Sequence, residues 1–219
     1  ATEMLQAAVG IAGLLAVALV GLLIGIIALG GDDDDPKSNP VAAPTSSAPA
    51  GDATPAAATA RKLTVKDVRI IDPDSKNRSE VRGAEKVIDG DEDKGWETET
   101  YVNRPNFGNL KKGMGVWIDL GEPHTVKSVQ AVLSATGASA QLLAGTTNPP
   151  SSTNGDKQLV ASYKTAIGQP FEDHDGTTMT FNGFDADQKY QYLLFWITEL
   201  PPSEGGFKLG VQEITVQGS

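Results

Sequence analysis

The chain has 219 residues, which is enough for one domain with appended segments. Its 28 acidic residues outnumber its 18 Lys and Arg, and the formal charge of -10 argues against nucleic acid or anionic lipid head groups as partners, because both repel an acidic surface. There is no cysteine, so the sequence offers neither disulfides nor a thiolate metal site.

The first predicted element is an apolar helix near the N-terminus. No charged residue occurs in 5–31, and residues 7–29 are all Ala, Gly, Leu, Ile or Val. This run exceeds the roughly 20 residues that a helix needs to cross the hydrocarbon core of a bilayer. A signal peptide fits less well, because no basic residue precedes the run. Residues 1–31 are therefore predicted to hold a single transmembrane helix, with 5–31 in the membrane.

The segment after this helix is polar and is predicted to be a linker. Four aspartates at 32–35 come first, and residues 36–60 consist mainly of Pro, Ala, Ser and Thr. Such a composition buries too little apolar surface to fold, so 32–61 should be an acidic cap followed by an extended linker. No Lys/Arg cluster follows the span, which favours an extracellular C-terminal part at the cell membrane. Because the chain begins with Ala1, we expect it to be the C-terminal part of a longer protein.

Residues 62–219 have the pattern of an all-β domain. Short apolar runs alternate with turns that are rich in Gly, Asn, Pro and Asp. Eight strands are predicted, at 63–70, 115–120, 126–133, 140–144, 158–163, 177–181, 190–198 and 209–216. No amphipathic helix is expected after the span, and this succession of short strands is typical of a β-sandwich.

Several features predict how the core of this domain is built. The strand at 190–198 is apolar on both faces, so it should lie in the centre of a sheet. Gly90, in an Asp-Gly pair, should form a tight turn with a positive φ. Trp96 and Trp117 are expected in the core rather than on a ligand surface. The polar run 172–175 is expected to be a hairpin loop rather than a metal or acid–base cluster.

Five motifs are spaced along this domain. They are Ala84-x4-Asp89-Gly90-Asp91, then Trp96, then Trp117-Ile118-Asp119-Leu120-Gly121, then Val126-x2-Val129, and finally Val211-x-Glu213-Ile214-x-Val216. Together they resemble the coagulation factor 5/8 type C, or discoidin, family of galactose-binding-like domains, to which the family 32 carbohydrate-binding modules belong. The resemblance covers about residues 64–217. The order of one span, a Pro/Ala linker and such a domain is similar to the C-terminal end of actinobacterial MviN-type lipid II flippases and of kinase-like receptors.

This resemblance implies a jelly-roll β-sandwich whose loops at one end bind a sugar or another small polar ligand. The segment 97–109 mixes aromatic, amide and arginine side chains, which suit the apolar face and the paired hydroxyls of a sugar. The ligand-binding candidates are Tyr101, Asn103, Arg104, Phe107 and Asn109. The alternative is that the two aromatic rings close the end of the barrel and that the arginine pairs with Glu97 or Glu99.

The resemblance also implies a structural Ca²⁺ where the acidic turn meets a carboxylate near the C-terminus. Its ligands would be Asp89, Asp91 and Glu213, whose oxygen atoms suit this cation. The departure from the family pattern is Lys94, since the family commonly has Thr or Ser at that position. The ammonium of Lys94 could take the place of the cation by pairing with Asp91 or Asp93, and the sequence leaves both possibilities open.

The sequence argues against an enzyme and for a binding module. Only His124 and His174 are present, neither lies in a nucleophile motif, and a Ser or Thr nucleophile would lack an obvious base. The expected function is a non-catalytic extracellular module, tethered to the membrane, that recognises cell-wall glycan or a lipid-linked peptidoglycan precursor. The alternative is a scaffold or protein-interaction domain of a cell-envelope complex, without a small-molecule ligand. Exposed aromatic residues at one loop end would favour the first, and a broad apolar patch the second.

Overall fold

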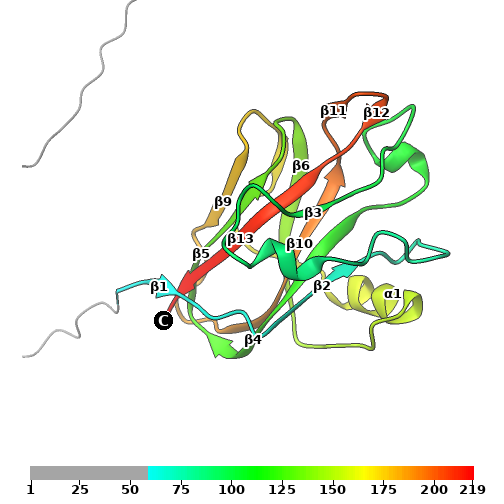
Figure 1. Ribbon diagram of the computed structural model, residues 1–219. Coiled ribbons are helices and arrows are strands. Elements are labelled where there is room, and N and C mark those ends of the chain that lie inside the picture. Colours follow the sequence, from blue (N-terminus) through cyan, green and yellow to red (C-terminus); the bar gives the residue numbers. More distant parts are fainter. Residues whose placement is uncertain (1–58) are drawn as a thin grey trace, which may run out of the picture. The chain divides into compact units, whose positions relative to one another are not determined.

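The computed structural model describes residues 59–219, which form two main antiparallel sheets that face each other (Figure 1). This arrangement confirms the predicted all-β sandwich. The predicted transmembrane helix, the acidic cap and nearly all of the linker lie outside the described residues. Within 59–219, no helix has the length and apolarity that a membrane span requires.

Sheet A contains strands from both ends of the domain. Its order is β1-β13-β5-β9, and β3 also pairs with β13. The strands are β1 (Arg61–Lys62), β3 (Trp96–Glu97), β5 (Val126–Leu133), β9 (Thr178–Asn182) and β13 (Gly210–Gly218). The C-terminal strand β13 therefore joins the beginning of the domain to its middle.

Sheet B is built around β10 (Tyr190–Glu199), and its order is β2-β4-β10-β6-β7, with β8 also paired to β6. The other strands are β2 (Asp67–Ile71), β4 (Met114–His124), β6 (Ala138–Gly145), β7 (Thr165–Ala166) and β8 (Phe171–His174). A small hairpin of β11 (Pro202–Ser203) and β12 (Gly206–Phe207) follows β10. Because β10 has a long partner on each side, its predicted central position is confirmed.

Side chains that alternate along β10 supply two separate cores. Leu193, Phe195 and Ile197 are buried between the two sheets. Leu194 and Trp196 lie in a second cluster on the outer face of sheet B. Successive residues of a strand point to opposite faces, so a strand that is covered on both sides has to be apolar throughout.

The outer cluster is closed by a helix, and here the sequence-based prediction was wrong. The segment predicted as a strand at 158–163 belongs largely to α1 (Thr153–Ser162). Ser152 caps the first turn of this helix, since its hydroxyl oxygen accepts a backbone N–H at 3.0 Å. Leu159 and Tyr163, four residues apart, are both buried in the outer cluster. That spacing places them on one face of a helix, which the short apolar run did not distinguish from a strand.

The polar run 172–175 is mostly strand, which also differs from the prediction. Strand β8 extends through His174, and the bend begins at residue 175. The ring of Phe171 packs on the rings of His174 and Phe181, with centroids 4.6 and 5.0 Å apart. One half-buried phenylalanine thus anchors an edge strand whose other residues are polar. The tight turn predicted at Gly90 is confirmed, with a φ of 83°.

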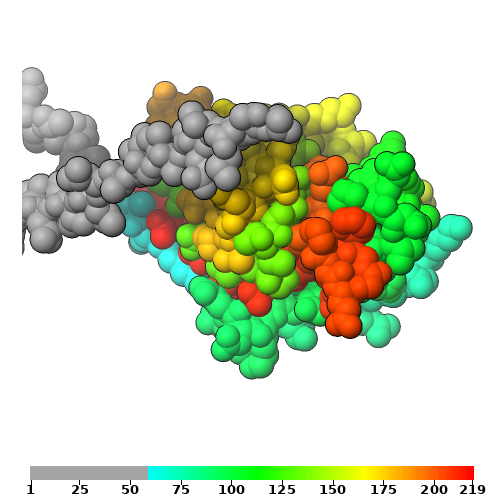
Figure 2. Space-filling view, turned by 90° about the horizontal axis from the view of Figure 1, so that it is seen from above, coloured from blue at the N-terminus to red at the C-terminus, as the bar shows by residue number. Residues whose placement is uncertain are grey.

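The start of the domain and its longest loop lie at opposite ends of the sandwich. Strand β1 pairs with the last residues of β13. At the other end lie the loop 101–113, which includes the short helix η2 (Phe107–Asn109), and the β11–β12 hairpin. A bridge between Tyr101 and Phe207 joins these two segments. Figures 1 and 2 show the green loop and the orange-red hairpin together, away from the cyan β1.

A fragment of residues 59–219 is expected to fold and to remain soluble, because both cores lie within it. It should show one cooperative thermal transition by circular dichroism. A shorter fragment, 66–219, lacks β1 and the buried Leu63, so it should melt at a lower temperature. Expression of 59–219 only as aggregate, or melting without cooperativity, would contradict this domain boundary.

Candidate functional site

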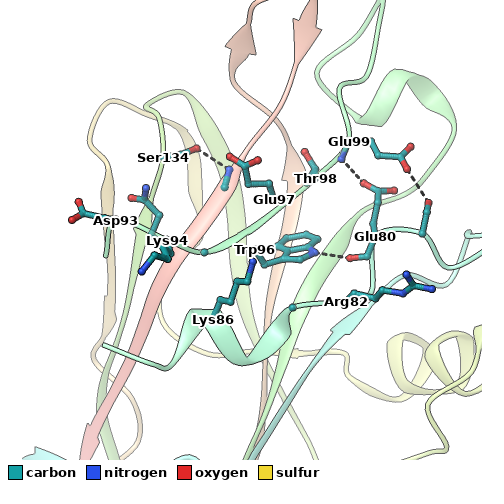
Figure 3. A pocket seen from close by; sticks show the side chains of 15 residues that line it. Glu80, Arg82, Lys86, Asp93, Lys94, Trp96, Glu97, Thr98, Glu99 and Ser134 are labelled. Atoms are coloured by element: carbon teal, nitrogen blue, oxygen red, sulfur yellow. Dashed lines mark hydrogen bonds between the residues drawn. The ribbon is translucent and has the colours of Figure 1, made fainter. Parts of the chain in front are cut away.

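A groove of about 510 Å³ lies along β3 (Figure 3). One wall comes from residues 79–86, which include the first three residues of the short helix η1 (Ala84–Val87). Residues 93–99 form the adjoining wall, and Ser134 and Gly210 border the groove next to β5 and β13. The groove therefore gathers side chains from parts of the sequence that are far apart.

A glycine and a tryptophan hold β3 against the sheet. A Cβ atom at Gly95 would lie 2.3 Å from the carbonyl oxygen of Val211, so only glycine lets the backbone run this close to β13. The side chain of Trp96 is buried, and its indole N–H donates to the carbonyl of Glu80, as Figure 3 shows. Trp96 therefore belongs to the core and offers no platform for a sugar ring. Trp117 is buried as well, so both predictions are confirmed.

The rim of the groove carries charges of both signs. Glu97 pairs with Lys208, with 2.7 Å between the carboxylate and the ammonium. Glu99 accepts a hydrogen bond of 2.8 Å from a serine hydroxyl of the opposite wall. Arg82 and Lys86 also line the groove, and neither forms an ion pair within 59–219. The groove thus offers both free cations and carboxylates to a ligand.

Exposed apolar surface is scarce in the part of the chain that the structure describes. None of its Phe, Tyr or Trp residues is exposed. Its exposed large apolar side chains are Val102 and Leu110, which are 57% and 75% accessible. The groove is therefore suited to recognise a ligand through hydrogen bonds and charge rather than through aromatic stacking.

A buried ammonium group joins Glu80, which lines the groove, to a second loop. The side chain of Lys111 is only 9% exposed, and its Nζ donates to Asp72 at 2.6 Å and also to Glu80. Glu80 in turn accepts the backbone N–H of Glu99 and the hydroxyl of Tyr101, both at 2.7 Å. Burial, followed by the nearby carboxylate of Glu80, raises the pKa of Tyr101 far above its usual value, so its hydroxyl remains a donor.

A further carboxylate, Asp156, extends this network to α1. Its Oδ2 accepts the backbone N–H of Asp72 at 3.1 Å and a guanidinium N–H of Arg78 at 2.7 Å. Both aspartates are completely buried. Burial raises the pKa of Asp72, although the hydrogen bond from Lys111 acts in the opposite direction. The network therefore fixes the loop between β2 and η1 from two sides.

The structure divides the predicted ligand-binding residues into two groups. Tyr101 and Phe107 are buried, and their rings meet edge to face with centroids 5.2 Å apart. They close the end of the barrel, as the alternative considered from the sequence has it, and their faces are not open to a sugar. Asn103, Arg104 and Asn109 are exposed. Arg104 forms no ion pair with any carboxylate in 59–219, so its pairing with a glutamate is not observed.

The residues predicted to bind Ca²⁺ are engaged with protein donors. Lys94 forms an ion pair with Asp91, and this hydrogen bond lowers the pKa of the Asp91 carboxyl group. Asp89 accepts the backbone N–H of Asp91 at 2.9 Å. The buried Glu213 accepts a backbone N–H of the acidic turn at 3.0 Å and lies 3.4 Å from the ammonium of Lys62. No group of three His, Asp or Glu residues within 59–219 is arranged to hold a metal ion. The pair of Lys94 with Asp91 is the arrangement that the lysine alternative describes, and Ca²⁺ binding at this turn stays a prediction.

Sequence reasoning missed Asp72, Glu80 and Lys111 as well as the groove itself. Lys111 lies 39 residues from Asp72 and 31 from Glu80, so no local motif records the pairing. One signal was available: residues 101–118 contain no acid, so a lysine that becomes buried there has to find its counter-charge elsewhere in the chain.

Comparison with known proteins finds no matching family model. Solved structures that are similar to this chain include a CBM32 module of AlyQ in complex with 4,5-unsaturated mannuronic acid. It is 14% identical, with a TM-score of 0.47, and the match covers 71% of this chain and 97% of that chain. Chitosan-binding module 1 from a chitosanase/glucanase of Paenibacillus sp. IK-5 is 15% identical, with a TM-score of 0.47. The match covers 69% of this chain and 94% of that chain.

Two further solved structures are similar to this chain. Reduced XRCC1 bound to the DNA pol beta catalytic domain is 11% identical, with a TM-score of 0.48 and coverage of 73% of this chain and 99% of that chain. A truncated AlyQ with CBM32 and alginate lyase domains is 16% identical, with a TM-score of 0.47. The match covers 74% of this chain but only 34% of that longer chain.

Replacing Lys111 with methionine should destabilise the domain by about 3–5 kcal/mol, because Asp72 and Glu80 would be buried without a cation. The matched control is Lys112→Met, which changes an exposed neighbour and should cost less than about 0.5 kcal/mol. Urea unfolding measures both. The penalty of Lys111→Met should shrink at mildly acidic pH, because protonation neutralises Asp72, whose pKa is raised by burial. Equal penalties for the two variants would refute the role given to Lys111.

Added Ca²⁺ and added chelator are both expected to leave the melting temperature of fragment 59–219 unchanged, because Asp91 and Glu213 are already paired with Lys94 and Lys62. Glu213→Gln should lower the melting temperature by the same amount with and without Ca²⁺. Thermal denaturation followed by circular dichroism tests this. A melting temperature that rises with Ca²⁺ in the unaltered fragment, but not in the variant, would restore the metal site.

Proposed function

We propose that this chain provides a non-catalytic module that binds a cell-wall glycan, either a peptidoglycan strand or its lipid-linked precursor, in the groove along β3. The observation that carries the proposal is the groove itself, where charged, hydroxyl and amide groups from separate segments converge on one open cavity. Polar groups placed in this way can form hydrogen bonds with the paired hydroxyls and the acyl amides of sugars. Because no aromatic ring is exposed there, the ligand is held by hydrogen bonds and charge.

The rigid construction of the groove supports binding rather than catalysis. Its walls are fixed by the close contact at Gly95 and by the hydrogen bonds of Glu80. Both histidines lie elsewhere: the Nε2 of His174 bonds to the carbonyl of Thr178 at 2.9 Å, and His124 lies at the end of β4. Binding sites on strands are held more precisely than sites on loops, which suits recognition of a regular polymer.

The attachment of the chain supports a glycan of the wall as ligand. We place residues 5–31 in the cell membrane as a single span, with the domain outside. Strand β1, at the start of the described residues, and the loop 101–113 lie at opposite ends of the sandwich (Figure 1). The exposed Asn103, Arg104 and Asn109 are proposed as additional contacts to the glycan at that end.

A second candidate function is a protein-interaction domain in an envelope complex. The observation that favours it is the exposure of Val102 and Leu110 on one loop, since exposed apolar side chains often mark protein contacts. The two candidates predict different ligands, so one set of binding measurements separates them.

Co-sedimentation of fragment 59–219 with purified peptidoglycan tests the proposal. The double variant Glu97→Gln, Glu99→Gln should bind about tenfold more weakly or worse, since a hydrogen bond to a charged group contributes about 1.5–3 kcal/mol. Glu172→Gln is the matched control, because this exposed acid lies on β8, outside the groove, and should bind as before. Absence of binding by the unaltered fragment would contradict the glycan proposal and leave the protein-interaction function.

A further inference from the structure

The groove along β3 carries positive and negative side chains on different walls. Arg82 and Lys86 come from the wall that includes η1, and both side chains are exposed. Glu97 and Glu99 come from the adjoining wall and are exposed as well. In the view of Figure 3 the two cations lie below Trp96 and the two carboxylates lie above it. A ligand seated across this tryptophan therefore meets positive charge on one side and negative charge on the other.

These charges differ in how far the protein itself neutralises them. Arg82 and Lys86 form no ion pair with any residue of 59–219. The carboxylate of Glu97 is paired with Lys208, so part of its charge is already used. Glu99 has no ammonium partner within the same range, and its Oε1 accepts the hydroxyl of a serine at 2.8 Å. Across the tryptophan, the groove thus offers two free cations and one free carboxylate.

This arrangement disfavours a ligand whose charge has a single sign. An anion alone, such as a phosphate, would lie near Glu99, and Asp93 also lines the groove. A cation alone would lie near Arg82 and Lys86. Because a ligand displaces water from these groups, like charges that are brought together there cost free energy, whereas opposite charges offset the loss of water. The groove therefore fits a ligand that has two anionic groups and one cationic group.

Uncharged polar groups complete the lining of the groove. The hydroxyl oxygen of Ser134 accepts the backbone N–H of Gly210 at 2.8 Å, which leaves the hydroxyl proton available to a ligand. The side-chain amide of Gln212 also lines the groove. Such groups can form hydrogen bonds with the N–H and C=O groups of a peptide as well as with the hydroxyls of a sugar. The charges therefore decide which part of a glycopeptide polymer the groove fits.

We infer that the groove binds the short peptide that peptidoglycan carries, with two carboxylates toward Arg82 and Lys86 and a free side-chain ammonium toward Glu99. This inference rests on the proposed function and specifies which part of the polymer is recognised. In uncross-linked peptidoglycan whose peptide contains a diamino acid, that peptide has both signs of charge, whereas the N-acetylated sugars have no ammonium group. Cross-linking converts the ammonium into a neutral amide, so the groove should bind the uncross-linked polymer in preference to the cross-linked wall.

Two synthetic peptides test this charge pattern. N-acetyl-alanyl-γ-D-glutamyl-lysine has two carboxylates and one ammonium, and the same peptide acetylated on its lysine side chain lacks only the ammonium. In isothermal titration calorimetry with the full chain in detergent, side-chain acetylation should weaken binding about threefold or more. Salt should weaken binding of the peptide with the free amine, because screening reduces the attraction between charges. Equal affinities for the two peptides would overturn the inference.

Single variants assign each charge to its partner. Glu99→Gln keeps an acceptor for the serine hydroxyl and should make the two peptides bind equally, whereas Arg82→Gln should weaken both by a similar factor. Glu172→Gln on β8 and Lys127→Gln on β5 are the matched controls, since both side chains are exposed and lie outside the groove, and they should change neither affinity. A preference for the free amine that persists in Glu99→Gln would contradict the inference.

Glycan strands immobilised on beads separate this inference from the proposed function. Strands from which an amidase has removed the peptides should retain less of the full chain than intact strands do. If both kinds of strand retain it equally well, the inference fails and the glycan proposal stands. If neither kind retains it, the proposed function itself fails.

Discussion

The ion pairs of one buried ammonium group, that of Lys111, are the interaction on which both the groove and the loop end of this molecule depend. A charge at this depth is tolerated only when its partners are in contact, and both Asp72 and Glu80 are. Glu80 in turn contacts residues that Lys111 itself does not reach. Its carboxylate holds the backbone of Glu99 and the hydroxyl of Tyr101, and its carbonyl accepts the indole N–H of a core tryptophan. One carboxylate thus sets both a wall of the groove and the closure of the barrel end.

The groove and the loop end of the sandwich (residues 101–113) are therefore held in place by the same contacts. The groove is rigid because β3 lies against β13 with no room for a side chain at Gly95. The loop 101–113 is held because the buried Phe107 fills the end of the sandwich. The ion pair of Lys111 with Asp72 ties the same loop to the segment after β2. Neither surface has exposed aromatic rings, so both depend on polar groups that are held in place beforehand. Such preorganisation lowers the ordering cost of binding, which matters for a ligand recognised mainly through hydrogen bonds.

Much of the fold could be predicted from the sequence, because apolar residues that alternate along the sequence are buried along the strands of the structure. The strand 190–198 reads as apolar on both faces and is covered on both faces. The helix α1 was not predictable in the same way: the buried apolar side chains of Leu159 within it and of Tyr163 just after it leave a pattern too short to separate a helix from a strand. The tightly closed turns, such as that at Gly90, follow directly from residue type.

The candidate site was less predictable from the sequence than the fold. A loop that mixes aromatic and amide residues has a sugar-binding composition, but composition does not say which rings face inward, and Tyr101 and Phe107 do. Long-range charge pairs such as Lys111 with Asp72 depend on the folded topology, so they leave no local pattern. At the acidic turn the departure from the family pattern was visible in the sequence as Lys94, and the structure places that lysine on Asp91.

The central claim is that a polar groove along β3 receives a glycan strand without aromatic stacking. The most direct measurement is an amide NMR titration of fragment 59–219 with soluble, uncross-linked peptidoglycan strands. The account predicts saturable shifts at residues 93–99, at Ser134 and at residues 210–212, with the remote β9 unchanged. Shifts that are absent from these positions, or that spread evenly over both sheets, would contradict it.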